Sequence, residues 1–196
     1  MIVRVAKSAG FCYGVRRAVE LAERSAAQGP VYLLGHITHN DHVIGRLEEM
    51  GAVTISAPVE APRGSTVLIR AHGEPDSTYQ ELEARECRVL DATCPNVARI
   101  HDIVRKAEER GRIPVVAGEG DHPEILGILG CTRCGTVVSG WDELEQIMKK
   151  VPDFPGMPLT FVSQTTAILS KWEKIVENTK KVCTNAEFFD TICNAT

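Results

Sequence analysis

The 196-residue chain lacks the features that mark several special classes of protein. Its net charge is −4 and its pI is about 5.9, so it has no overall basic field to attract nucleic acid or an anionic membrane. Its longest apolar runs are about five residues, too short for a membrane-spanning helix. The start, MIVRVAKSAGF, has no apolar core of a secretory signal. We therefore expect a cytoplasmic protein with no nucleic-acid or membrane partner.

What remains is the composition of an ordinary globular protein. Hydrophobic residues make up 43% of the chain and charged residues 24%. A disordered chain would have fewer apolar residues and a larger net charge. The length is enough for one large domain or two small ones.

The seven cysteines are unusual for such a chain. A disulfide framework is not expected in the cytoplasm, and an odd number cannot pair completely. The alternatives are buried small side chains, ligands of a metal or cluster, and a nucleophile. For any one cysteine taken alone, a buried inert thiol is the commoner case.

Strand-like and helix-like segments alternate along the chain, which predicts parallel α/β units. The predicted strands are residues 1–6, 31–35, 52–55, 65–71, 87–91, 113–118, 135–139 and 159–164. The predicted helices are residues 14–29, 40–51, 75–86, 96–110, 123–129, 141–150 and 167–182, with Asn40 as an N-cap and Gly51 beyond the end of its helix.

Residues able to carry chemistry gather just after the strands. The segments there are GHITHN, RAHG, DATCPN, GEGDHPE, SQTT and DTICN. Ligand sites in parallel α/β sheets lie at the carboxyl ends of the strands. The sequence therefore predicts one functional edge.

Cys12, Cys94 and Cys193 stand out among the cysteines. An Asp-x-x-Cys pattern precedes both Cys94 and Cys193, and glycines flank Cys12. Helix starts at these positions would favour thiolates. The wide spacing excludes a local zinc loop and a compact ferredoxin run, but it permits a cluster held where lobes meet, with one of four irons left open.

The repeated pattern also predicts the division of the chain. We expect an N-terminal strand and first cluster ligand over 1–12, one α/β lobe over 13–95, and a second over 96–192. Residues 193–196 would then begin a third lobe that this chain lacks. Cys193 would have little to hold it in place.

Three histidines follow predicted strand ends, namely His39, His72 and His122. Imidazoles beside helix amides make a pocket suited to phosphate. A lone histidine is more often a satisfied surface or core residue, and this interpretation is kept for His42 and His101.

Two further side chains belong to the same edge, Glu124 and Thr165. A carboxylate at a helix start is usually a cap, but one kept protonated beside an anion pocket could donate a proton. Thr165 could pass a proton or fix a hydroxyl, although an isolated threonine there is more often a cap.

Cys131 and Cys134 form a C-x-x-C pair, which occurs in redox proteins and as half of a zinc site. No second pair completes four ligands. A structural or incidental role is favoured, while a thiol or zinc protein that uses this pair stays open as an alternative.

Taken together, the motifs resemble a known family. They are GFCYGVRRA, THN, RAHG, DATCP, GDHPE, SQTT and FDTICNAT, in that order. In this order they resemble the motifs of the 4-hydroxy-3-methylbut-2-enyl diphosphate reductases, the LytB family. The resemblance implies repeated three-layer α/β lobes, with mainly parallel sheets, around a central iron–sulfur site.

The resemblance also implies an activity and roles for single residues. The family removes the 4-hydroxyl of the allylic diphosphate with two electrons and two protons, and gives isopentenyl and dimethylallyl diphosphate in the last step of the methylerythritol phosphate pathway. The matching positions are Cys12, Cys94 and Cys193 for a 4Fe–4S cluster, His39, His72 and His122 for the diphosphate, Glu124 as proton donor, and Thr165 near the substrate hydroxyl.

Ferredoxin or flavodoxin is the electron donor that the resemblance implies. The family's third lobe contributes further diphosphate contacts, so a remnant that binds a diphosphate or a partner without turnover is a second alternative.

Overall fold

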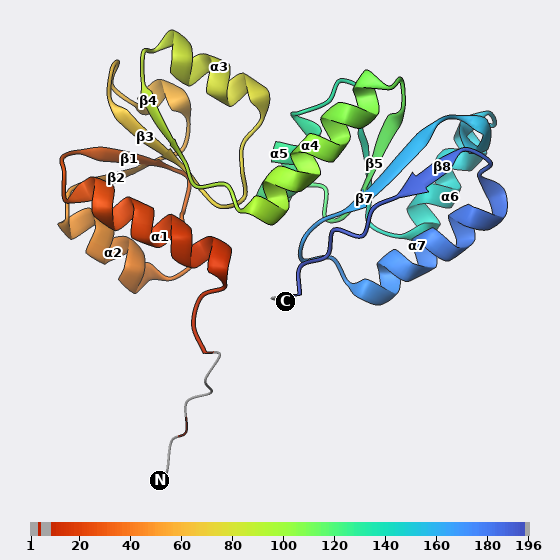
Figure 1. Cartoon of the computed structure of the whole chain (residues 1–196), viewed down its shortest axis with the longest axis horizontal. Helices are drawn as coiled ribbons and strands as arrows, with labels where there is room; N and C mark the ends of the chain where they lie inside the picture. The colour runs from red at the N-terminus through yellow and green to blue at the C-terminus, as the bar shows by residue number, and fades with distance from the viewer. Residues whose placement is uncertain (1–3, 5–8, 195–196) are drawn as a thin grey trace. The chain divides into compact units, whose positions relative to one another are not determined.

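The structure, a computed structural model, describes residue 4 and residues 9–194. Among these residues, the first compact unit holds the chain up to Ala71 together with Arg85–Cys94. The second unit holds His72–Ala84 and the chain from Pro95 onward. Each unit contains one four-stranded parallel sheet (Figure 1). An α/β fold with mainly parallel sheets is therefore confirmed.

In the first unit the strands lie in the order β2-β1-β3-β4. They are β1 (Val31–Leu34), β2 (Ala52–Ile55), β3 (Thr66–Ile69) and β4 (Arg88–Asp91). The helices are α1 (Tyr13–Ala26), α2 (Asp41–Glu49) and a 3-10 turn, Pro58–Glu60. Both α-helices share one buried cluster with alternate residues of β1, Val31 and Leu33. This period-two pattern gives the strand one face for the core of the unit.

The start and end of α2 follow the predicted signals. The Asn40 side chain accepts a hydrogen bond from the Val43 amide at 3.2 Å, as an N-cap does. Gly51, two residues beyond the helix, has a φ of +93°, in the left-handed region that glycine adopts without strain.

In the second unit the strands lie in the order β6-β5-β7-β8. They are β5 (Ile113–Ala117), β6 (Thr136–Val138), β7 (Leu159–Ser163) and β8 (Ala186–Phe188). The helices are α3 (Asp76–Ala84), α4 (Pro95–Glu109), α5 (Pro123–Leu129), α6 (Trp141–Lys150), α7 (Leu169–Val182) and a 3-10 turn, Phe154–Gly156.

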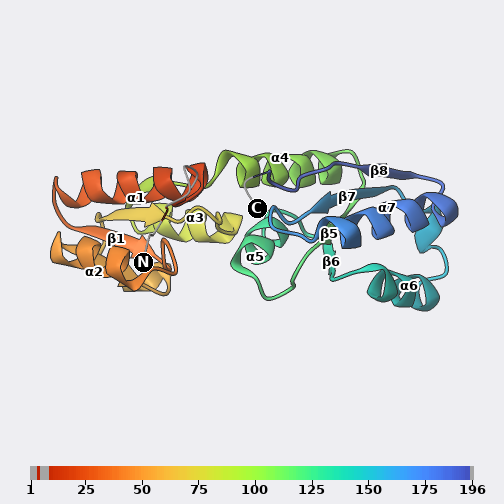
Figure 2. The same ribbon diagram turned by 90° about the horizontal axis from the view of Figure 1, so that it is seen from below.

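Helices cover both faces of the second sheet. Val115 and Phe161 point into the cluster formed with α6 and α7, whereas their neighbours Val116 and Val162 point into the cluster formed with α4 and α5. Figures 1 and 2 both show α4 on the opposite side of this sheet from α6 and α7. The strands are buried on both faces, so they contain continuous apolar runs.

Helix α3 belongs to a different unit from the two strands that it connects. Along the chain it joins β3 to β4 of the first sheet, yet it groups with the second unit. The Asp76 amide donates to the Gly130 carbonyl at 3.3 Å, and the Asp76 carboxylate pairs with Arg105 at 2.5 Å. The chain therefore passes between the units three times.

Parallel strands bring their carboxyl ends to one edge of each sheet. From β5 the chain goes to β6 on one side and then to β7 on the other, so the ends of β5 and β7 form a topological switch point. Such points are where open α/β sheets bind ligands.

Most predicted elements agree with the structure to within about two residues at each end, the usual uncertainty in such boundaries. Among the described elements, strand β8 and the two 3-10 turns are missing from the predicted ones, because runs of three residues carry too little periodicity. The predicted strand over 1–6 lies outside the described residues, apart from Arg4, and so does a helix start after Cys193. No helix in the described part of the chain is both long and apolar enough to cross a membrane.

Candidate active site

The centre of the candidate site is a buried acid, Glu124, in the first turn of α5. Its side chain is 2% exposed. One carboxylate oxygen accepts the Thr165 amide hydrogen and the other accepts the Thr165 hydroxyl hydrogen, both at 2.6 Å. Thr165 lies just beyond β7 and is itself buried. The two residues predicted for proton chemistry are therefore in direct contact across the switch point.

Burial raises the pKa of the Glu124 carboxyl, because the ionised form loses its hydration. The two hydrogen bonds from Thr165 and the adjacent His122 lower the pKa, but by less than burial raises it. A buried carboxyl with a raised pKa is suited to carry a proton.

His122 is the N-cap of α5. Its Nδ1 accepts the Glu124 amide hydrogen at 3.1 Å, so the imidazole hydrogen of the neutral ring lies on Nε2. The His122 and His72 rings meet edge to face, with centroids 5.4 Å apart and planes at 87°. Two of the three histidines predicted for anion binding therefore lie together in the second unit.

His39 belongs to the first unit. It is exposed and directly precedes the N-cap of α2. His36 is exposed in the same loop. Helix α2 holds His42 at the surface and α4 holds His101 in the core, as expected for histidines without a role in binding.

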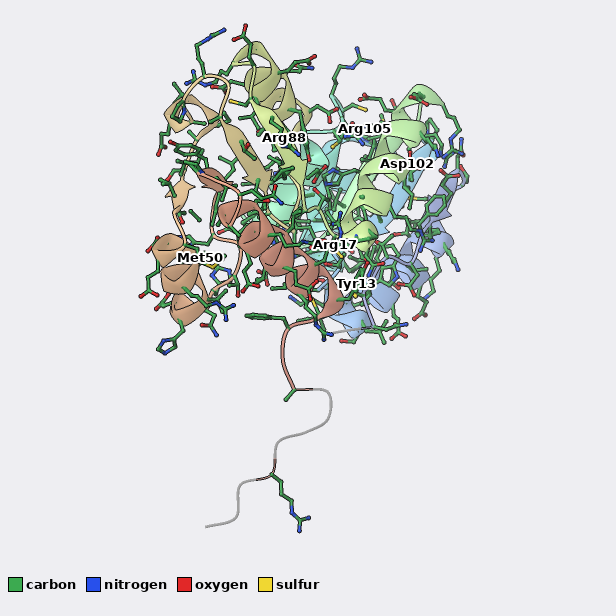
Figure 3. All side chains as sticks on the ribbon, turned by 60° about the vertical axis from the view of Figure 1, so that its left-hand side comes forward. Tyr13, Arg17, Met50, Arg88, Asp102 and Arg105 are labelled. Carbon is green, nitrogen blue, oxygen red and sulfur yellow. The ribbon has the colours of Figure 1, made fainter. Side chains whose placement is uncertain are left out.

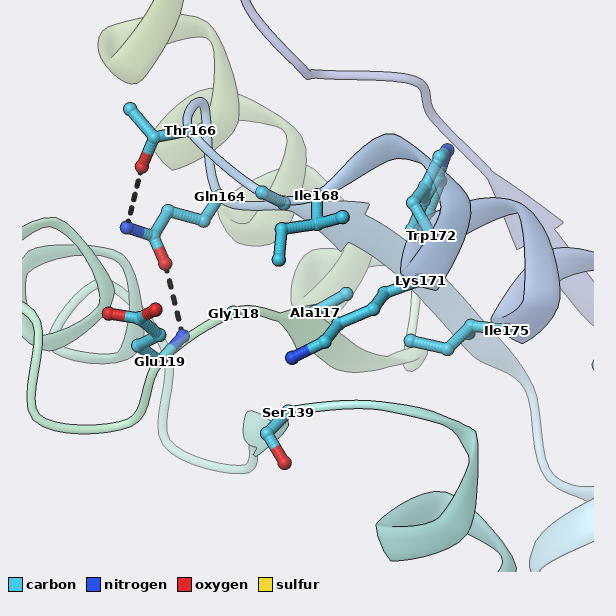
Figure 4. Close-up of a pocket in the computed structure, with 11 residues that line it drawn as sticks. Ala117, Gly118, Glu119, Ser139, Gln164, Thr166, Ile168, Lys171, Trp172 and Ile175 are labelled. Atoms are coloured by element: carbon cyan, nitrogen blue, oxygen red, sulfur yellow. Dashed lines mark hydrogen bonds between the residues drawn. The ribbon is translucent and has the colours of Figure 1, made fainter. Parts of the chain in front are cut away.

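Gln164 is a residue that sequence reasoning missed. Its side chain is 3% exposed, accepts the Glu119 amide hydrogen at 3.0 Å and donates to the Thr166 hydroxyl at 2.9 Å (Figure 4). A Cβ on Gly118 would lie 2.7 Å from the Gln164 Oε1. Gln164 thus ties the loop after β5 to the loop after β7. The only signal was its place in the SQTT segment.

A small pocket of about 70 Å³ lies beside these hydrogen bonds of Gln164. Figure 4 shows Lys171 extending from α7 into it, with Ser139 nearby. Its other lining residues are Ala117, Gly118, Glu119, Gln164, Thr166, Ala167, Ile168, Trp172 and Ile175. Glu124 and Thr165 do not line this pocket.

Cys193 lies beside Thr165. Its amide donates to the Thr165 carbonyl at 2.8 Å, and its Sγ accepts a hydrogen bond from the Asn96 Nδ2 at 3.1 Å. The expectation that little holds Cys193 is therefore wrong, because hydrogen bonds fix both its backbone and its sulfur. In the second unit Cys193, through its backbone amide, is bonded to Thr165, which is bonded in turn to Glu124.

Cys12 and Cys94 lie at the start of α1 in the first unit. Cys12 is the N-cap residue of α1, and its side chain makes no capping bond. A Cβ on Gly14, two residues later, would lie 2.7 Å from the Cys94 Sγ. Only glycine leaves room there for the sulfur, and the amino end of a helix favours thiolates.

The turn that carries Cys94 is also fixed to α1. Arg17 of α1 donates to the Thr93 carbonyl at 3.0 Å and to the Asp91 carbonyl at 3.3 Å. Figure 3 shows Arg17 on α1, one turn after the exposed Tyr13. The Cys94 amide donates to the Ala71 carbonyl at 2.9 Å.

The thiols suit a soft metal centre by their chemistry. All seven cysteines are free of disulfides, and Gly14 leaves a space beside the Cys94 sulfur. Thiolates are the usual ligands of iron–sulfur clusters. Within the described part of the chain, no group of three or more His, Cys, Asp or Glu side chains forms a metal site by itself. Cys12 and Cys94 belong to the first unit and Cys193 to the second.

The C-x-x-C pair has a different environment. Cys131 is buried, its Sγ is 3.3 Å from the His101 Nδ1, and burial raises the pKa of its thiol to about 12. Burial also raises the pKa of the Cys134 thiol. The buried Cys131 thiol therefore resists forming the thiolate that redox or zinc chemistry requires, which favours a structural role.

Comparison with known proteins gives matches over nearly the whole chain. A model of the family described as LytB protein matches residues 3–196. The 4-hydroxy-3-methylbut-2-enyl diphosphate reductase of Aquifex aeolicus is 37% identical over 98% of this chain and 66% of its own length. The enzyme of the same name from Caldanaerobacter subterraneus is 35% identical over 100% of this chain and 68% of its own. The chain thus spans about two thirds of the length of these relatives.

Solved structures agree. One, titled as (E)-4-hydroxy-3-methyl-but-2-enyl diphosphate reductase, the terminal enzyme of the non-mevalonate pathway, is 36% identical with a TM-score of 0.84, over 98% of this chain and 68% of its own. The reductase structure from Plasmodium falciparum is 27% identical with a TM-score of 0.85, over 94% of this chain and 58% of its own. Sequence and fold together show that the chain belongs to the LytB protein family.

Proposed function

We propose that this chain takes part in the reductive removal of the 4-hydroxyl of 4-hydroxy-3-methylbut-2-enyl diphosphate. The products would be isopentenyl and dimethylallyl diphosphate, with the hydroxyl leaving as water. The names of the relatives support this substrate. The observation that carries the proposal is the hydrogen-bonded set of a buried acid, a threonine and a cysteine, Glu124, Thr165 and Cys193.

In the proposal, Cys12, Cys94 and Cys193 hold a 4Fe–4S cluster. When bound, a cluster with three thiolate ligands supplies electrons and offers its fourth iron as a Lewis acid toward the substrate hydroxyl. This assignment requires the two units to bring Cys193 to the other two cysteines. The Asn96 amide would direct a hydrogen bond at the Cys193 sulfur, as partners of metal ligands do.

Protons would come from Glu124. Its raised pKa keeps a proton available, and Thr165 is placed to pass that proton on or to hold the substrate hydroxyl. His39, His72 and His122 would bind the diphosphate through imidazole N–H groups. The edge-to-face pair of His72 and His122 supports two of these three assignments.

Several further points belong to the proposal. Ferredoxin or flavodoxin would deliver the two electrons, the protein would act in the cytoplasm, and a third lobe would begin near Cys193.

Cluster binding is tested by anaerobic purification and reconstitution with iron and sulfide. We expect a brown protein with visible thiolate-to-iron absorbance, lost in Cys94→Ser and kept in Cys131→Ser. A colourless wild-type protein without bound iron would contradict the cluster. Iron that depends on Cys131 instead of Cys94 would favour the thiol or zinc alternative.

Turnover is tested separately, with the allylic diphosphate and a chemical reductant. Formation of the two products by the full chain rules out a protein that only binds the diphosphate. Binding of the diphosphate without product, in protein that holds its iron, would support the remnant instead.

A further inference from the structure

The segment that leads to Cys193 continues alongside β7 beyond the end of β8. The Phe189 amide donates to the Phe161 carbonyl at 2.9 Å, and the Cys193 amide donates to the Thr165 carbonyl at 2.8 Å. Between these two bonds, the backbone groups of Ser163 form hydrogen bonds with a side chain and not with the backbone of the neighbouring segment. That side chain belongs to Thr191.

The Thr191 hydroxyl takes the place of a backbone group. It donates to the Ser163 carbonyl at 2.6 Å and accepts the Ser163 amide hydrogen at 2.8 Å. The Ser163 hydroxyl lies 2.9 Å away. Thr191 is 6% exposed and Ser163 is fully buried, so water cannot replace these bonds. A hydroxyl offers one donor and two acceptor sites, which is what this place uses.

In the first unit, a backbone amide makes the corresponding hydrogen bond to the neighbouring strand. There the Ala92 amide donates to the Ile69 carbonyl at 3.0 Å, before the Cys94 amide donates to Ala71. Ala92 and Thr191 hold the same place in the two Asp-x-x-Cys patterns. In the first pattern the residue after the aspartate bonds through its backbone, so alanine is sufficient there. In the second pattern the residue bonds through its side-chain hydroxyl, so the position of the cysteine depends on that hydroxyl.

We propose that Thr191 is the positioning residue of Cys193. By bonding to Ser163, it holds residues 190–193 in the register that places the Cys193 amide on Thr165, next to Glu124. The identity of the group that the Cys193 sulfur binds rests on the proposed function. The role of Thr191 in positioning Cys193 does not rest on it.

The test compares three variants of the full chain. Thr191→Val keeps the shape of the side chain and removes the hydroxyl, whereas Thr191→Ser restores it. Thr179→Val is the matched control, because Thr179 is fully buried in α7 and its hydroxyl has no hydrogen-bond partner among the described residues. Neither the serine variant nor the control should behave differently from wild type.

The first measurement is the alkylation rate of each cysteine in iron-free protein, read by peptide mass. In Thr191→Val, Cys193 should react at least about tenfold faster, because the variant loses the buried hydrogen bonds to Ser163, while Cys183 at the end of α7 should not change. Equal acceleration at both cysteines would mean general loosening and would overturn the proposal. An unchanged Cys193 rate would also overturn it.

The second measurement is the loss of iron to a chelator after reconstitution. Thr191→Val should lose iron about tenfold faster than wild type, with Thr191→Ser and Thr179→Val close to wild type. If wild type binds no iron, the proposed function fails, and the alkylation result still decides the role of Thr191.

Should the valine variant not fold, amide hydrogen exchange of wild-type chain gives the answer. The Ser163 and Cys193 amides should be protected to within about tenfold of each other, because one set of bonds holds both. Rapid exchange at Cys193 beside a protected Ser163 would contradict the proposal.

Discussion

The two Asp-x-x-Cys turns show how the two units achieve one result by different means. In both, the aspartate Oδ1 accepts the amide hydrogen two residues later, at 2.8 Å from Asp91 to Thr93 and at 3.3 Å from Asp190 to Ile192. In both, the cysteine amide then donates to a carbonyl two residues beyond the end of the neighbouring strand, Ala71 after β3 and Thr165 after β7. The first turn is fixed by a residue of another element, Arg17 of α1, which donates to the Thr93 carbonyl. The second is fixed by one of its own residues, Thr191, which bonds to Ser163. The repeated sequence pattern is therefore a repeated turn.

The units differ most in how many polar side chains they bury. Among the described residues, Thr93 is the only buried polar side chain of the first unit, and it is 9% exposed. The second unit buries Glu124, Ser163, Gln164, Thr165 and Thr191 at the carboxyl edge of its sheet. The first unit thus has thiols at a helix start, and the second has a buried carboxyl group held by hydrogen bonds. Four predictions examine this contrast.

The largest effect is expected on turnover. Glu124→Gln keeps the size of the side chain and removes its proton, so product formation should fall by about 10²–10⁴-fold while bound iron is unchanged. Glu119→Gln changes an exposed carboxylate nearby and serves as control. Wild-type turnover in Glu124→Gln would show that the second unit does not supply the proton.

Next in size is the packing of a glycine against a thiol. In Gly14→Ala the new Cβ would meet the Cys94 Sγ at 2.7 Å, so the free energy of unfolding should fall by about 1–3 kcal/mol. Gly45→Ala in α2 has open space around its Cβ and should instead gain about 1 kcal/mol from helix propensity. Urea denaturation of both variants gives the two values. A gain in Gly14→Ala would mean that the sulfur can move away.

Smaller effects should separate the two aspartates. Asp91→Ala loses bonds from both the amide and the hydroxyl of Thr93 and should cost about 1–2 kcal/mol. Asp190→Ala loses one longer and exposed bond and should cost about 0.5 kcal/mol. Thermal unfolding of each variant measures the difference. Equal costs would remove the distinction between a turn fixed by its aspartate and one fixed by Thr191.

The smallest signal is the pH dependence of stability. Because the pKa of Glu124 is higher in the folded chain than its usual value of 4.5, the folded state holds more protons between the two values. The free energy of unfolding should therefore fall as pH rises through that interval. The Glu124→Gln variant should lack this fall. Denaturant titrations from pH 4 upward compare the two proteins, and identical slopes would contradict the burial effect.

The sequence was enough to predict the alternation of elements and the edge at which they would place chemistry. Strand ends share an edge whenever strands are parallel, so His122, Glu124 and Thr165 could be placed there without coordinates. The contact of Glu124 with Thr165 could not be predicted, because it depends on β7 lying next to β5 and not on sequence spacing.

Two hydrogen-bonding roles were also hidden in the sequence. Gln164 and Thr191 look like ordinary polar residues near strand ends, and their importance comes from burial beside backbone groups that need partners. Cys193 was expected to be poorly held because it lies near the end of the sequence, whereas its bonds reach Thr165 and Asn96, which are distant in the chain.

Because α3 belongs to the second unit, the two units cannot be separated by a single cut in the chain. Cutting the gene between the codons for Cys94 and Pro95 would give two contiguous pieces, yet the first would carry α3 away from Arg105 and Gly130. The second piece would then expose the surface that α3 covers. A workable dissection has to supply residues 72–84 to the second piece, either as an added peptide or by rejoining the chain in a permuted order.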